Sequence, residues 1–535
     1  MIIDAKRVGI GEQGEPATLN NLASDLNKEL FAKHIFNALL SDAISVNRSL
    51  PDVRPRECKT KLYLKKLPMV SIIVIFFNEH KSVLLRSVHS LINRSPPELV
   101  KEIILVDDFS DLDSLHKSLD DYIAQHFTKV RILRLNERSG LIRARMAGAR
   151  IAKAEVLVFM DSHIEAGYNW LPPLLEPIVL NSRTVMGPTI DFINGTQFFY
   201  GKYDYGMRGI FDFSLRYLKT SRLPEDQKHP SEPFKNLIMM GGSVVISAKF
   251  FWELGGYDEG LDIYGGEQFD LSFKIWMCGG QLYEAPCSRV AHLSRSSHLH
   301  LYNTKNVTVT KYIYRNYKRV AEVWMDDYKK YVSMRMGSSY RRANPGDLTL
   351  ARALRSKCKP FKWFLQNVAY DVMKRFPPIK PPNYAYGAIR NVAEPDMCVD
   401  AHPITNGNHV DLEQCAEAVP QSNSSQFWEL TAYRDLRLAS KDFCLEVRAP
   451  QYITSLWIWR CHYQGRNQYW LYDFQAKLLK QVFKNTTRCL EMLPHTKQLI
   501  INQCNSSNRY MQWTFSFNNP NALGNNQNNY SIQSA

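Results

Sequence analysis

The stretch Val156-Leu-Val-Phe-Met-Asp161-Ser162-His163 decides the fold expected for the first half of this 535-residue chain. An unbroken apolar run is typical of a strand buried on both faces of a parallel sheet. Residues two apart on a strand point to the same face, so the Asp161 carboxylate and the His163 imidazole can reach one divalent cation together. Manganese accepts oxygen and imidazole ligands. An open α/β sheet binds its ligands outside the carboxyl ends of its strands, where this pair lies.

Strand-like and helix-like segments alternate on both sides of this stretch. Strands are expected at residues 70–77, 102–108, 130–135 and 155–160, and helical spacing occurs at 82–92 and 141–151. Parallel strands joined by crossover helices produce this alternation, so the sequence predicts an α/β sheet. A further helix is expected near the N-terminus, over Leu22–Leu40.

The last third of the chain contains an internal repeat of roughly 45 residues. Each copy has a Cys-x-acid motif followed by a motif that ends in Trp. The three pairs of motifs are Cys398-Val-Asp400 with Gln426-Phe-Trp428, Cys444-Leu-Glu446 with Gln468-Tyr-Trp470, and Cys489-Leu-Glu491 with Met511-Gln-Trp513. One copy cannot bury a core alone, but three packed together can. We expect the tryptophans in that shared core.

Six of the ten cysteines form evenly spaced pairs in this repeat. The pairs are Cys398/Cys415, Cys444/Cys461 and Cys489/Cys504, separated by 17, 17 and 15 residues. One disulfide per repeat is expected, which implies an oxidising compartment. The chain has no Cys-x-x-Cys motif, so a zinc or thioredoxin-like site is not indicated. Glycosylation sequons agree with a secretory route; they begin at Asn47, Asn93, Asn194, Asn306, Asn423, Asn485, Asn505 and Asn529.

Composition divides the chain into five expected segments. Residues 1–50 form an N-terminal extension or stem, 51–370 the α/β domain, 371–384 a Pro-rich linker, 385–518 the repeat domain and 519–535 an Asn-rich disordered tail. The linker contains Phe376-Pro-Pro-Ile-Lys-Pro-Pro-Asn383, which cannot form a regular element. The tail has too few apolar residues to fold.

The chain is basic, with a net charge of +15, and its densest basic stretch is Lys311–Arg342. A solvated helix face is the favoured interpretation over a phosphate-binding or nucleic-acid surface, because no nucleic-acid module accompanies the stretch. The longest apolar run, Val70–Phe77, is too short to span a membrane. We therefore expect any membrane anchor to be outside this chain or trimmed from it.

Polar residues near other predicted strand ends are further site candidates. Asp107-Asp108 closes the second strand and can hold a nucleotide, although one of the two acids can simply cap a loop. Arg138 precedes a helix and can contact phosphate or base, or it can be a solvated surface residue. Glu267, after two glycines, can stand at the mouth of a cleft or cap a helix. His292 is the candidate third metal ligand, although an isolated histidine is more often a core residue.

These segments together resemble one family. The matching segments are Val70–Ser110, Asn136–Arg145, Asp161–His163, Gly265–Gly280, Pro286–His292 and Arg319–Asp326, and they are similar to the polypeptide N-acetylgalactosaminyltransferases. The repeat resembles the ricin-type β-trefoil lectin domain that those enzymes carry at the C-terminus. The resemblance implies an α/β GT-A fold, a Rossmann-like nucleotide-diphospho-sugar transferase domain, followed by an all-β trefoil domain.

The resemblance also implies an activity. The protein is expected to use Mn²⁺ and to move N-acetylgalactosamine from UDP-N-acetylgalactosamine to Ser or Thr hydroxyls, with retention at the anomeric carbon. Its acceptors are Ser/Thr-rich peptides or glycopeptides, and nucleic acid is not among its partners. The family further implies a type II membrane protein of the Golgi lumen.

Single residues carry over by position. Asp161, His163 and His292 match the manganese ligands, and Asp108, Arg138 and Ser162 match donor-binding positions. Glu267 matches the acid near the reacting sugar, and Arg295 and His298 match a loop that closes over UDP. Asp400 is the expected lectin sugar-binding acid. The resemblance pairs Cys58 with Cys287 and Cys278 with Cys358.

The chain departs from the family pattern at several site positions. It has Ile75 for Thr, Phe77 for His, Phe213 for Trp, Tyr264 for Trp, Gln268 for Asn and His300 for Tyr. Tyr264 and His300 are still expected to contact substrate, whereas Ile75 should remove a polar donor contact and Phe213 should alter the acceptor groove. These departures motivate a second hypothesis, a catalytically impaired relative that binds UDP or glycoprotein and acts through its lectin domain. A basic nucleic-acid binder ranks well below both.

Overall fold

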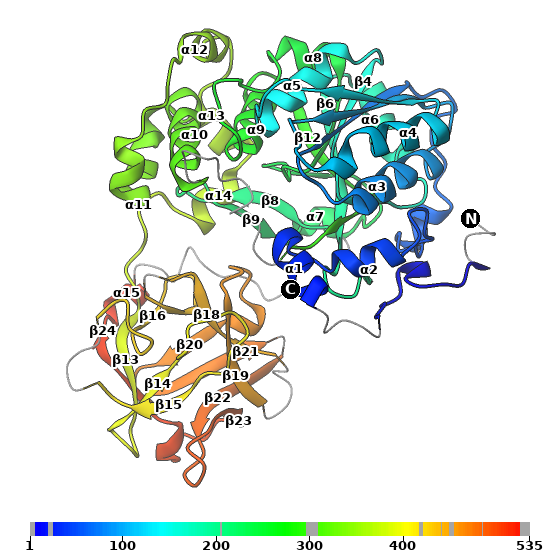
Figure 1. The fold of residues 1–535 in the computed structure, drawn as a ribbon. Helices are drawn as coiled ribbons and strands as arrows, with labels where there is room; N and C mark the ends of the chain where they lie inside the picture. Colours follow the sequence, from blue (N-terminus) through cyan, green and yellow to red (C-terminus); the bar gives the residue numbers. More distant parts are fainter. Residues whose placement is uncertain are drawn as a thin grey trace. The chain divides into compact units, whose positions relative to one another are not determined.

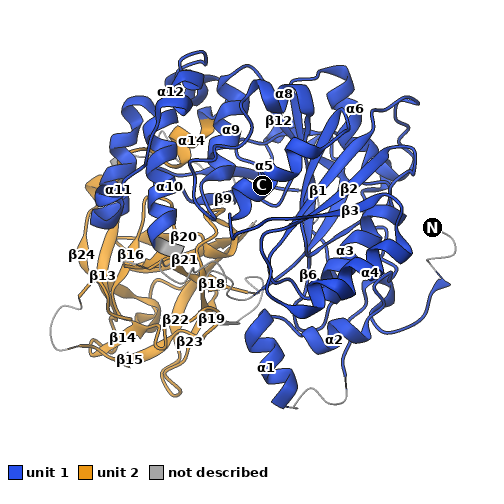
Figure 2. Ribbon diagram, turned by 45° about the horizontal axis from the view of Figure 1, so that its top comes forward, with its two compact units in different colours: residues 1–370 blue, residues 371–535 orange. Residues whose placement is uncertain are grey.

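The computed structural model (Figure 1) describes residues 6–19, 25–203, 206–295, 309–416, 421–439, 441–448, 454–483 and 485–524. The chain divides into two compact units, residues 1–370 and 371–535, which Figure 2 shows in different colours. Each unit has its own hydrophobic core.

The first unit is built on a mixed sheet with the strand order β10-β12-β6-β11-β4-β1-β2-β3. The parallel half consists of β1 (Val70–Phe76), β2 (Val100–Asp107), β3 (Val130–Arg134) and β4 (Val156–Asp161). The other half consists of β11 (Ser243–Ser247), which is antiparallel to β4, then β6 (Thr184–Ile193), β12 (Gln281–Leu293) and β10 (Phe234–Lys235). Short β5 (Ile164–Ala166) pairs with β12, and β7 (Tyr200–Gly201) with β6. The expected α/β fold class is confirmed.

Alternate side chains of β1 enter two different cores because the strand is covered on both faces. Ile72 and Val74 face the core formed with α3 (Lys81–Asn93), α4 (Lys117–His126) and α6 (Pro172–Leu180), which Figure 1 shows over one face of the sheet. Ile73 faces α5 (Leu141–Ile151) on the other side, where a Cβ on Gly148 would lie 2.5 Å from Ile73 Cγ2. Only glycine allows α5 to approach the sheet this closely.

The single helix expected over Leu22–Leu40 is wrong. Helix α1 (Asp25–His34) ends before Ile35, whose φ of 61° lies in the left-handed region, and α2 (Ala38–Ala43) begins afresh. The Asn37 side chain accepts a hydrogen bond from the Leu40 amide at 3.0 Å and so caps α2. The hydrophobic periodicity of the sequence continues across this break, but the Asn37 cap and the left-handed backbone of Ile35 end one helix and begin another.

Residues of the expected N-terminal extension share a hydrophobic core with the sheet. Phe36, Leu40 and Ile44 pack in the same cluster as Ile193 of β6 and Leu293 of β12. The segment is therefore an integral part of the first unit.

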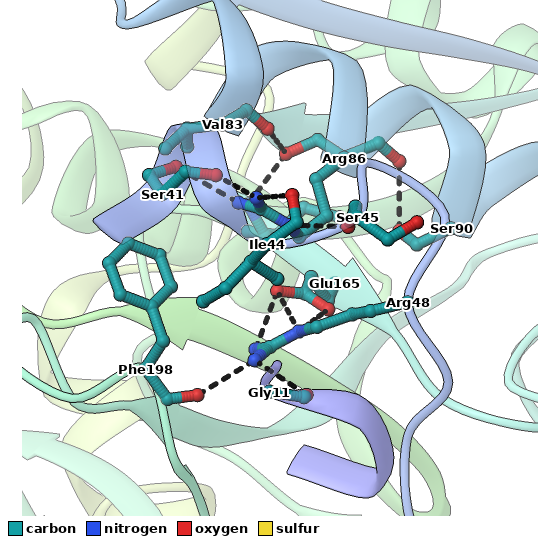
Figure 3. Close-up of polar contacts among 12 residues, drawn as sticks. Gly11, Ser41, Ile44, Ser45, Arg48, Val83, Arg86, Ser90, Glu165 and Phe198 are labelled. Carbon is teal, nitrogen blue, oxygen red and sulfur yellow. Dashed lines mark hydrogen bonds and ion pairs between the residues drawn. The ribbon is translucent and has the colours of Figure 1, made fainter. Parts of the chain in front are cut away.

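A buried ion pair fixes this segment to β5 (Figure 3). Arg48 donates to both carboxylate oxygens of Glu165, at 2.8 to 3.1 Å, and to the Phe198 carbonyl at 2.8 Å. Both side chains are almost fully buried. Arg86 of α3 donates to the Ser41 and Ile44 carbonyls in the same region. Glu165 lies two residues beyond His163, so the clamp holds the segment that carries a candidate metal ligand.

Helices complete the first unit around the second half of the sheet. They are α7 (Pro224–Gln227), α8 (Ala248–Glu253), α9 (Glu267–Met277), α10 (Val309–Trp324), α11 (Lys329–Arg342), α12 (Thr349–Arg355) and α13 (Phe361–Asn367), and the hairpin β8 (Arg208–Phe211) and β9 (Tyr217–Thr220) accompanies them. The basic stretch forms α10 and α11. It is not a uniformly solvated face, because Arg319 is buried against Asp258.

The second unit begins within α14 (Tyr370–Arg375), and residues 376–383 contain no helix or strand. Its strands are β13 (Ala385–Asn391), β14 (Met397–Asp400), β15 (Asp411–Gln414), β16 (Trp428–Leu430), β17 (Leu436–Leu438), β18 (Phe443–Val447), β19 (Thr454–Arg460), β20 (Trp470–Asp473), β21 (Leu478–Phe483), β22 (Thr486–Met492), β23 (Leu499–Asn502) and β24 (Trp513–Asn518). Of the expected tail, residues 521–524 form α15 and residues 525–535 lie outside the described part.

The three repeats contribute equivalent tryptophans to one core. Trp428, Trp470 and Trp513 are fully buried, and their indole N–H groups donate to the Val399, Leu445 and Leu490 carbonyls at 2.9 to 3.0 Å. Each acceptor carbonyl belongs to the residue that directly follows a half-cystine in its repeat, so the motif pairs found in the sequence meet in space.

Five disulfides link the cysteines as expected. Cys398–Cys415, Cys444–Cys461 and Cys489–Cys504 each close one repeat. Cys58–Cys287 and Cys278–Cys358 lie in the first unit. Within the described residues, no helix combines the length and apolar character needed to cross a bilayer.

We expect Arg48→Met to lower the free energy of unfolding of the first unit by about 3–5 kcal/mol, because it leaves the Glu165 charge buried and unpaired. Denaturant unfolding followed by circular dichroism measures the change. Lys117→Met is the matched control; it removes an exposed ion pair with Asp121 and should change stability by less than about 0.5 kcal/mol. Equal denaturant midpoints for the two variants would contradict a stabilising role of the Arg48–Glu165 ion pair.

Candidate active site

A pocket of about 940 Å³ opens at the carboxyl ends of β1, β2 and β4. It is the place where an open α/β sheet binds ligands. The pocket extends past β6 to the β8–β9 hairpin, so it runs along much of the sheet edge. Its described lining includes the predicted residues Asp108, Arg138, Asp161, Ser162, His163, Tyr264, Glu267, His292 and Arg295.

Asp161, His163 and His292 converge in this pocket. Their candidate ligand atoms all lie within 4.8 Å of one another. His292 Nε2 is 3.4 Å from Asp161 Oδ2, and the two imidazole centroids are 4.5 Å apart. His292 therefore faces the other two residues and is not a satisfied core histidine. One carboxylate and two imidazoles fit a manganese ion and leave coordination positions for a diphosphate.

Register explains why the third ligand arrives here. His292 lies on β12 opposite Ile164 of β5, and β5 begins one residue after His163. The pairing of β5 with β12 thus brings two histidines together that are far apart in sequence.

Glu79, which the sequence analysis missed, orients His163. Its buried carboxylate accepts from His163 Nδ1 at 2.8 Å, from Ser162 Oγ at 3.2 Å and from Arg295 at 2.6 Å. Burial opposes ionisation, but Arg295 and His163 outweigh it and hold the pKa of Glu79 well below its usual range. An ionised carboxylate can only accept, so Nδ1 carries the proton and Nε2 is left as the metal ligand. The detectable signal was an acid just beyond β1, the strand beside β4.

Arg145 is a second residue that the sequence analysis did not single out. It is fully buried on α5 and donates to the Gly241 carbonyl at 2.6 Å and to Asp161 Oδ1 at 3.4 Å. Burial alone would raise the pKa of Asp161, but the hydrogen bond to His292 and the charge of Arg145 lower it to about 2. Burial and Arg295 lower the pKa of His163. Near neutral pH the carboxylate is charged and the imidazole is neutral, as metal binding requires.

The loop before β11 approaches Asp161 closely. A Cβ on Gly242 would lie 2.4 Å from Asp161 Oδ2, and the Asp161 amide donates to the Gly242 carbonyl at 3.1 Å. A side chain at Gly242 would displace the carboxylate, so this glycine is required by the site.

Asp108 and Arg138 line the pocket where β2 ends. Asp108 is fully buried and accepts from the Ser139 and Gly140 amides, at 2.7 and 2.9 Å, and from Arg138. Burial raises its pKa even so. Arg138 also stacks on Phe77, with its guanidinium carbon 3.5 Å from the ring centroid, and is therefore not a free surface residue. Asp107 instead caps the following loop through the Ser110 amide and pairs with Arg134.

Of the two roles that the sequence left open for Glu267, the structure supports the pocket role, because no described side chain caps this helix by a hydrogen bond. Glu267 begins α9, and its buried side chain also lines the pocket. Its Oε2 has no hydrogen-bond partner among the described residues, and burial raises its pKa. A buried carboxyl oxygen without a partner is poised to meet a hydroxyl of a bound ligand.

Most of the remaining predicted residues also line the pocket. Tyr264 and Gln268 line the pocket, as do Ile75 and Phe77. Arg295 lines it too and is held by Glu79. His298 and His300 lie outside the described residues. Phe213 is fully buried against Tyr328 and Tyr331 and is not part of the described pocket lining, so its effect on an acceptor groove stays a prediction.

The lectin candidate Asp400 is held in place by its own repeat. Gln426 Nε2 donates to Asp400 Oδ2 at 2.9 Å, and the His402 amide donates to Oδ1 at 2.8 Å. Gln468 holds Glu446 in the same way at 2.8 Å. In the third repeat, where Met511 replaces the glutamine, Asn502 and Asn508 hold Glu491 at 2.9 Å. The acid is thus fixed in all three repeats by different amides.

Each of the two units matches the model of a known protein family. Residues 71–255 match the Glycosyl transferase family 2 model, and residues 385–513 match the Ricin-type beta-trefoil lectin domain. N-acetylgalactosaminyltransferase 6 of Drosophila melanogaster is 54% identical, over 98% of this chain and 78% of its own length. Polypeptide N-acetylgalactosaminyltransferase 10 of Rattus norvegicus is 43% identical, over 98% of this chain and 86% of its own.

A solved structure matches the whole architecture. The crystal structure of GalNAc-T7 with UDP, GalNAc and Mn²⁺ superposes with a TM-score of 0.65 at 32% identity, and the match covers 95% of this chain and 92% of that one. Identity of this degree over nearly the full length leaves no doubt about ancestry: the chain belongs to the polypeptide N-acetylgalactosaminyltransferase family.

Proposed function

We propose that this protein is a manganese-dependent retaining glycosyltransferase. It moves N-acetylgalactosamine from UDP-N-acetylgalactosamine to Ser or Thr hydroxyls of secretory-pathway proteins. The observation that carries the proposal is the convergence of Asp161, His163 and His292 in a pocket that also holds Asp108, Arg138 and Glu267. The related GalNAc-T7 structure, which contains UDP, GalNAc and Mn²⁺, supports this assignment.

The site residues take distinct roles in this proposal. Asp161, His163 and His292 would hold the ion, which when bound would supply Lewis-acid stabilisation of negative charge on the leaving diphosphate. Asp108 and Arg138 hold the nucleoside at the β1–β2 end. Arg295 donates toward the diphosphate as a preorganised positive group. Glu267 contacts the sugar that is transferred.

Retention at the anomeric carbon is carried over from the family resemblance. We assign no side chain as a covalent nucleophile, so the acceptor hydroxyl attacks from the face of the leaving group. The departing phosphate oxygen takes the hydroxyl proton as the new C–O bond forms and the C1–O–P bond breaks. Charged groups held in a buried pocket favour this charge separation more than water does.

The second candidate is a catalytically impaired relative that acts through its lectin domain. Phe77 and Tyr264, which replace the family's usual residues, do line the pocket and so favour this alternative. A transfer assay with Mn²⁺ over naked and pre-glycosylated Ser/Thr peptides tests both candidates. Transfer to any peptide supports the enzyme, whereas UDP binding without transfer supports the alternative.

We propose the Golgi lumen as the location and a type II membrane topology. The five disulfides support an oxidising, secretory compartment. Immunofluorescence of the protein in cells tests the location, and a cytosolic signal would contradict it.

Asp161→Ala should reduce Mn²⁺-dependent UDP binding and transfer by more than about 100-fold, because it removes the charged ligand. Calorimetry of UDP binding with and without EDTA, together with transfer rates, measures both effects. Asp121→Ala, an exposed acid on α4, is the control and should leave both unchanged. Wild-type transfer at full rate in EDTA would refute the metal role.

Glu79→Gln should weaken Mn²⁺ binding about 10–100-fold, because the amide no longer fixes the His163 tautomer. Binding of Mn²⁺ is followed directly by the loss of its free electron paramagnetic resonance signal. Saturating Mn²⁺ should restore most of the transfer rate. If the variant binds Mn²⁺ normally, Glu79 does not orient the ligand.

Asp400→Ala should abolish any preference for pre-glycosylated over naked peptides and leave kcat/KM for naked peptides unchanged. The carboxylate is held rigidly for hydroxyl groups of a sugar, and it is far in sequence from every metal ligand. Transfer rates on paired peptides measure the ratio. Asp411→Ala, exposed on β15, is the control; the same loss in both variants would argue against a specific site.

A further inference from the structure

Lys219 on β9 is a half-buried cation in the wall of the pocket. Its ammonium lies 5.1 Å from the centroid of the Tyr203 ring. Within the described part of the chain it forms no hydrogen bond and no ion pair. A charge in such surroundings is destabilised unless an anion approaches it, and burial accordingly lowers the pKa of Lys219.

The other half-buried or buried cations of the pocket are already matched. Arg138 pairs with Asp108, Arg145 with Asp161, and Arg295 with Glu79. Lys33, the remaining lysine of the lining, is exposed to solvent and needs no partner. Lys219 is therefore the half-buried Lys or Arg in this described lining that makes no direct ion pair.

Two acids lie near Lys219, but their own contacts engage them. Asp191 accepts from Arg289 at 2.9 Å, from Tyr200 at 2.6 Å and from the Tyr203 amide at 2.8 Å. Glu284 accepts from Thr189 at 2.9 Å and from Asn236 at 3.2 Å. Burial raises the pKa of Glu284 to about 7, although the nearby charge of Lys219 opposes this shift.

The sheet order places Lys219 on the acceptor side. Asp108 follows β2, whereas Lys219 lies beside Ile190 of β6, with which it lines both the main pocket and a small side recess. The strands β1, β4 and β11 separate β2 from β6. If the nucleoside occupies the Asp108 end, as the proposed function requires, the acceptor enters from the β6 end.

We propose that Lys219 is a specificity-determining residue that selects acceptors with an acidic side chain near the modified Ser or Thr. Tyr203, Tyr217 and Met240 provide an apolar surface around the ammonium for the peptide. A carboxylate that reaches Lys219 forms a charge-assisted hydrogen bond there, which corresponds to roughly a tenfold or larger preference. The inference rests on the proposed transferase function and names its acceptor class.

The test uses the full chain with Mn²⁺ and UDP-N-acetylgalactosamine. Peptides with a single Thr carry Asp, Asn or Lys in turn at each flanking position. For the wild type, kcat/KM should be about tenfold higher for Asp than for Asn at one of these positions. Lys219→Gln should lose that preference, Lys219→Arg should keep it, and Lys219→Glu should favour the Lys peptide. Lys235→Glu, an exposed charge on β10, is the control and should behave as wild type.

Three results would overturn the inference. One is equal wild-type rates on Asp and Asn peptides at every position. Another is a preference that Lys219→Gln retains. The last is a uniform loss on all acceptors with a raised KM for the donor, which would place Lys219 on the diphosphate.

Failure of the proposed function has a different signature. If no peptide is modified by any variant, the same Asp and Asn peptides are titrated, with a fluorescent label, against protein loaded with Mn²⁺ and UDP. Tighter binding of the Asp peptide to wild type than to Lys219→Gln would uphold the Lys219 site in a protein without turnover. Equal binding would refute it.

Discussion

The site depends on keeping Asp161 ionised and the His163 imidazole neutral in a pocket where both side chains are only partly exposed to solvent. Burial alone works against the carboxylate, and a fully unpaired charge at this depth would take up a proton. Arg145 and His292 supply the opposing interaction and lower the pKa of Asp161 to about 2. Glu79 orients the imidazole, because its carboxylate accepts a hydrogen bond from His163 Nδ1 and leaves Nε2 free. Asp161 and His163 are thus in the protonation states that metal binding requires.

The N-terminal segment extends this arrangement outward. Arg48 reaches across from residues 6–50 to Glu165, and Glu165 sits on the short strand whose pairing with β12 brings His292 to His163. Phe36 of the same segment lies under the Arg295 guanidinium, 5.3 Å from ring centroid to guanidinium carbon. Polar and apolar contacts from one segment therefore support both the metal ligands and the cation expected to face the diphosphate. The free energy of folding and the geometry of the site are linked through this segment.

The sequence predicted an element correctly wherever the pattern within that element alone specifies its structure. The apolar run ending in Asp161-Ser162-His163 predicted β4 and the two candidate metal ligands at its end, and the repeated Cys and Trp motifs predicted three equivalent trefoil repeats. The helix at 141–151 was predicted with its observed bounds, since its periodicity is unbroken. Prediction failed where a local interaction competes with periodicity. The Asn37 cap and the left-handed Ile35 divide one amphipathic pattern into two helices.

The sequence by itself determined the α/β class, the trefoil, the family resemblance and the candidate ligand types, because periodicity and motif spacing are properties of neighbouring residues. Only the tertiary structure decided that His292 faces Asp161, that Glu79 and Arg145 belong to the site, and that Phe213 is core. Within the described residues it also left Lys219 without an ion pair, while Arg138, Arg145 and Arg295 each have one. These facts depend on strand order and register between segments far apart in the chain, and no local pattern encodes which side chains those pairings bring together.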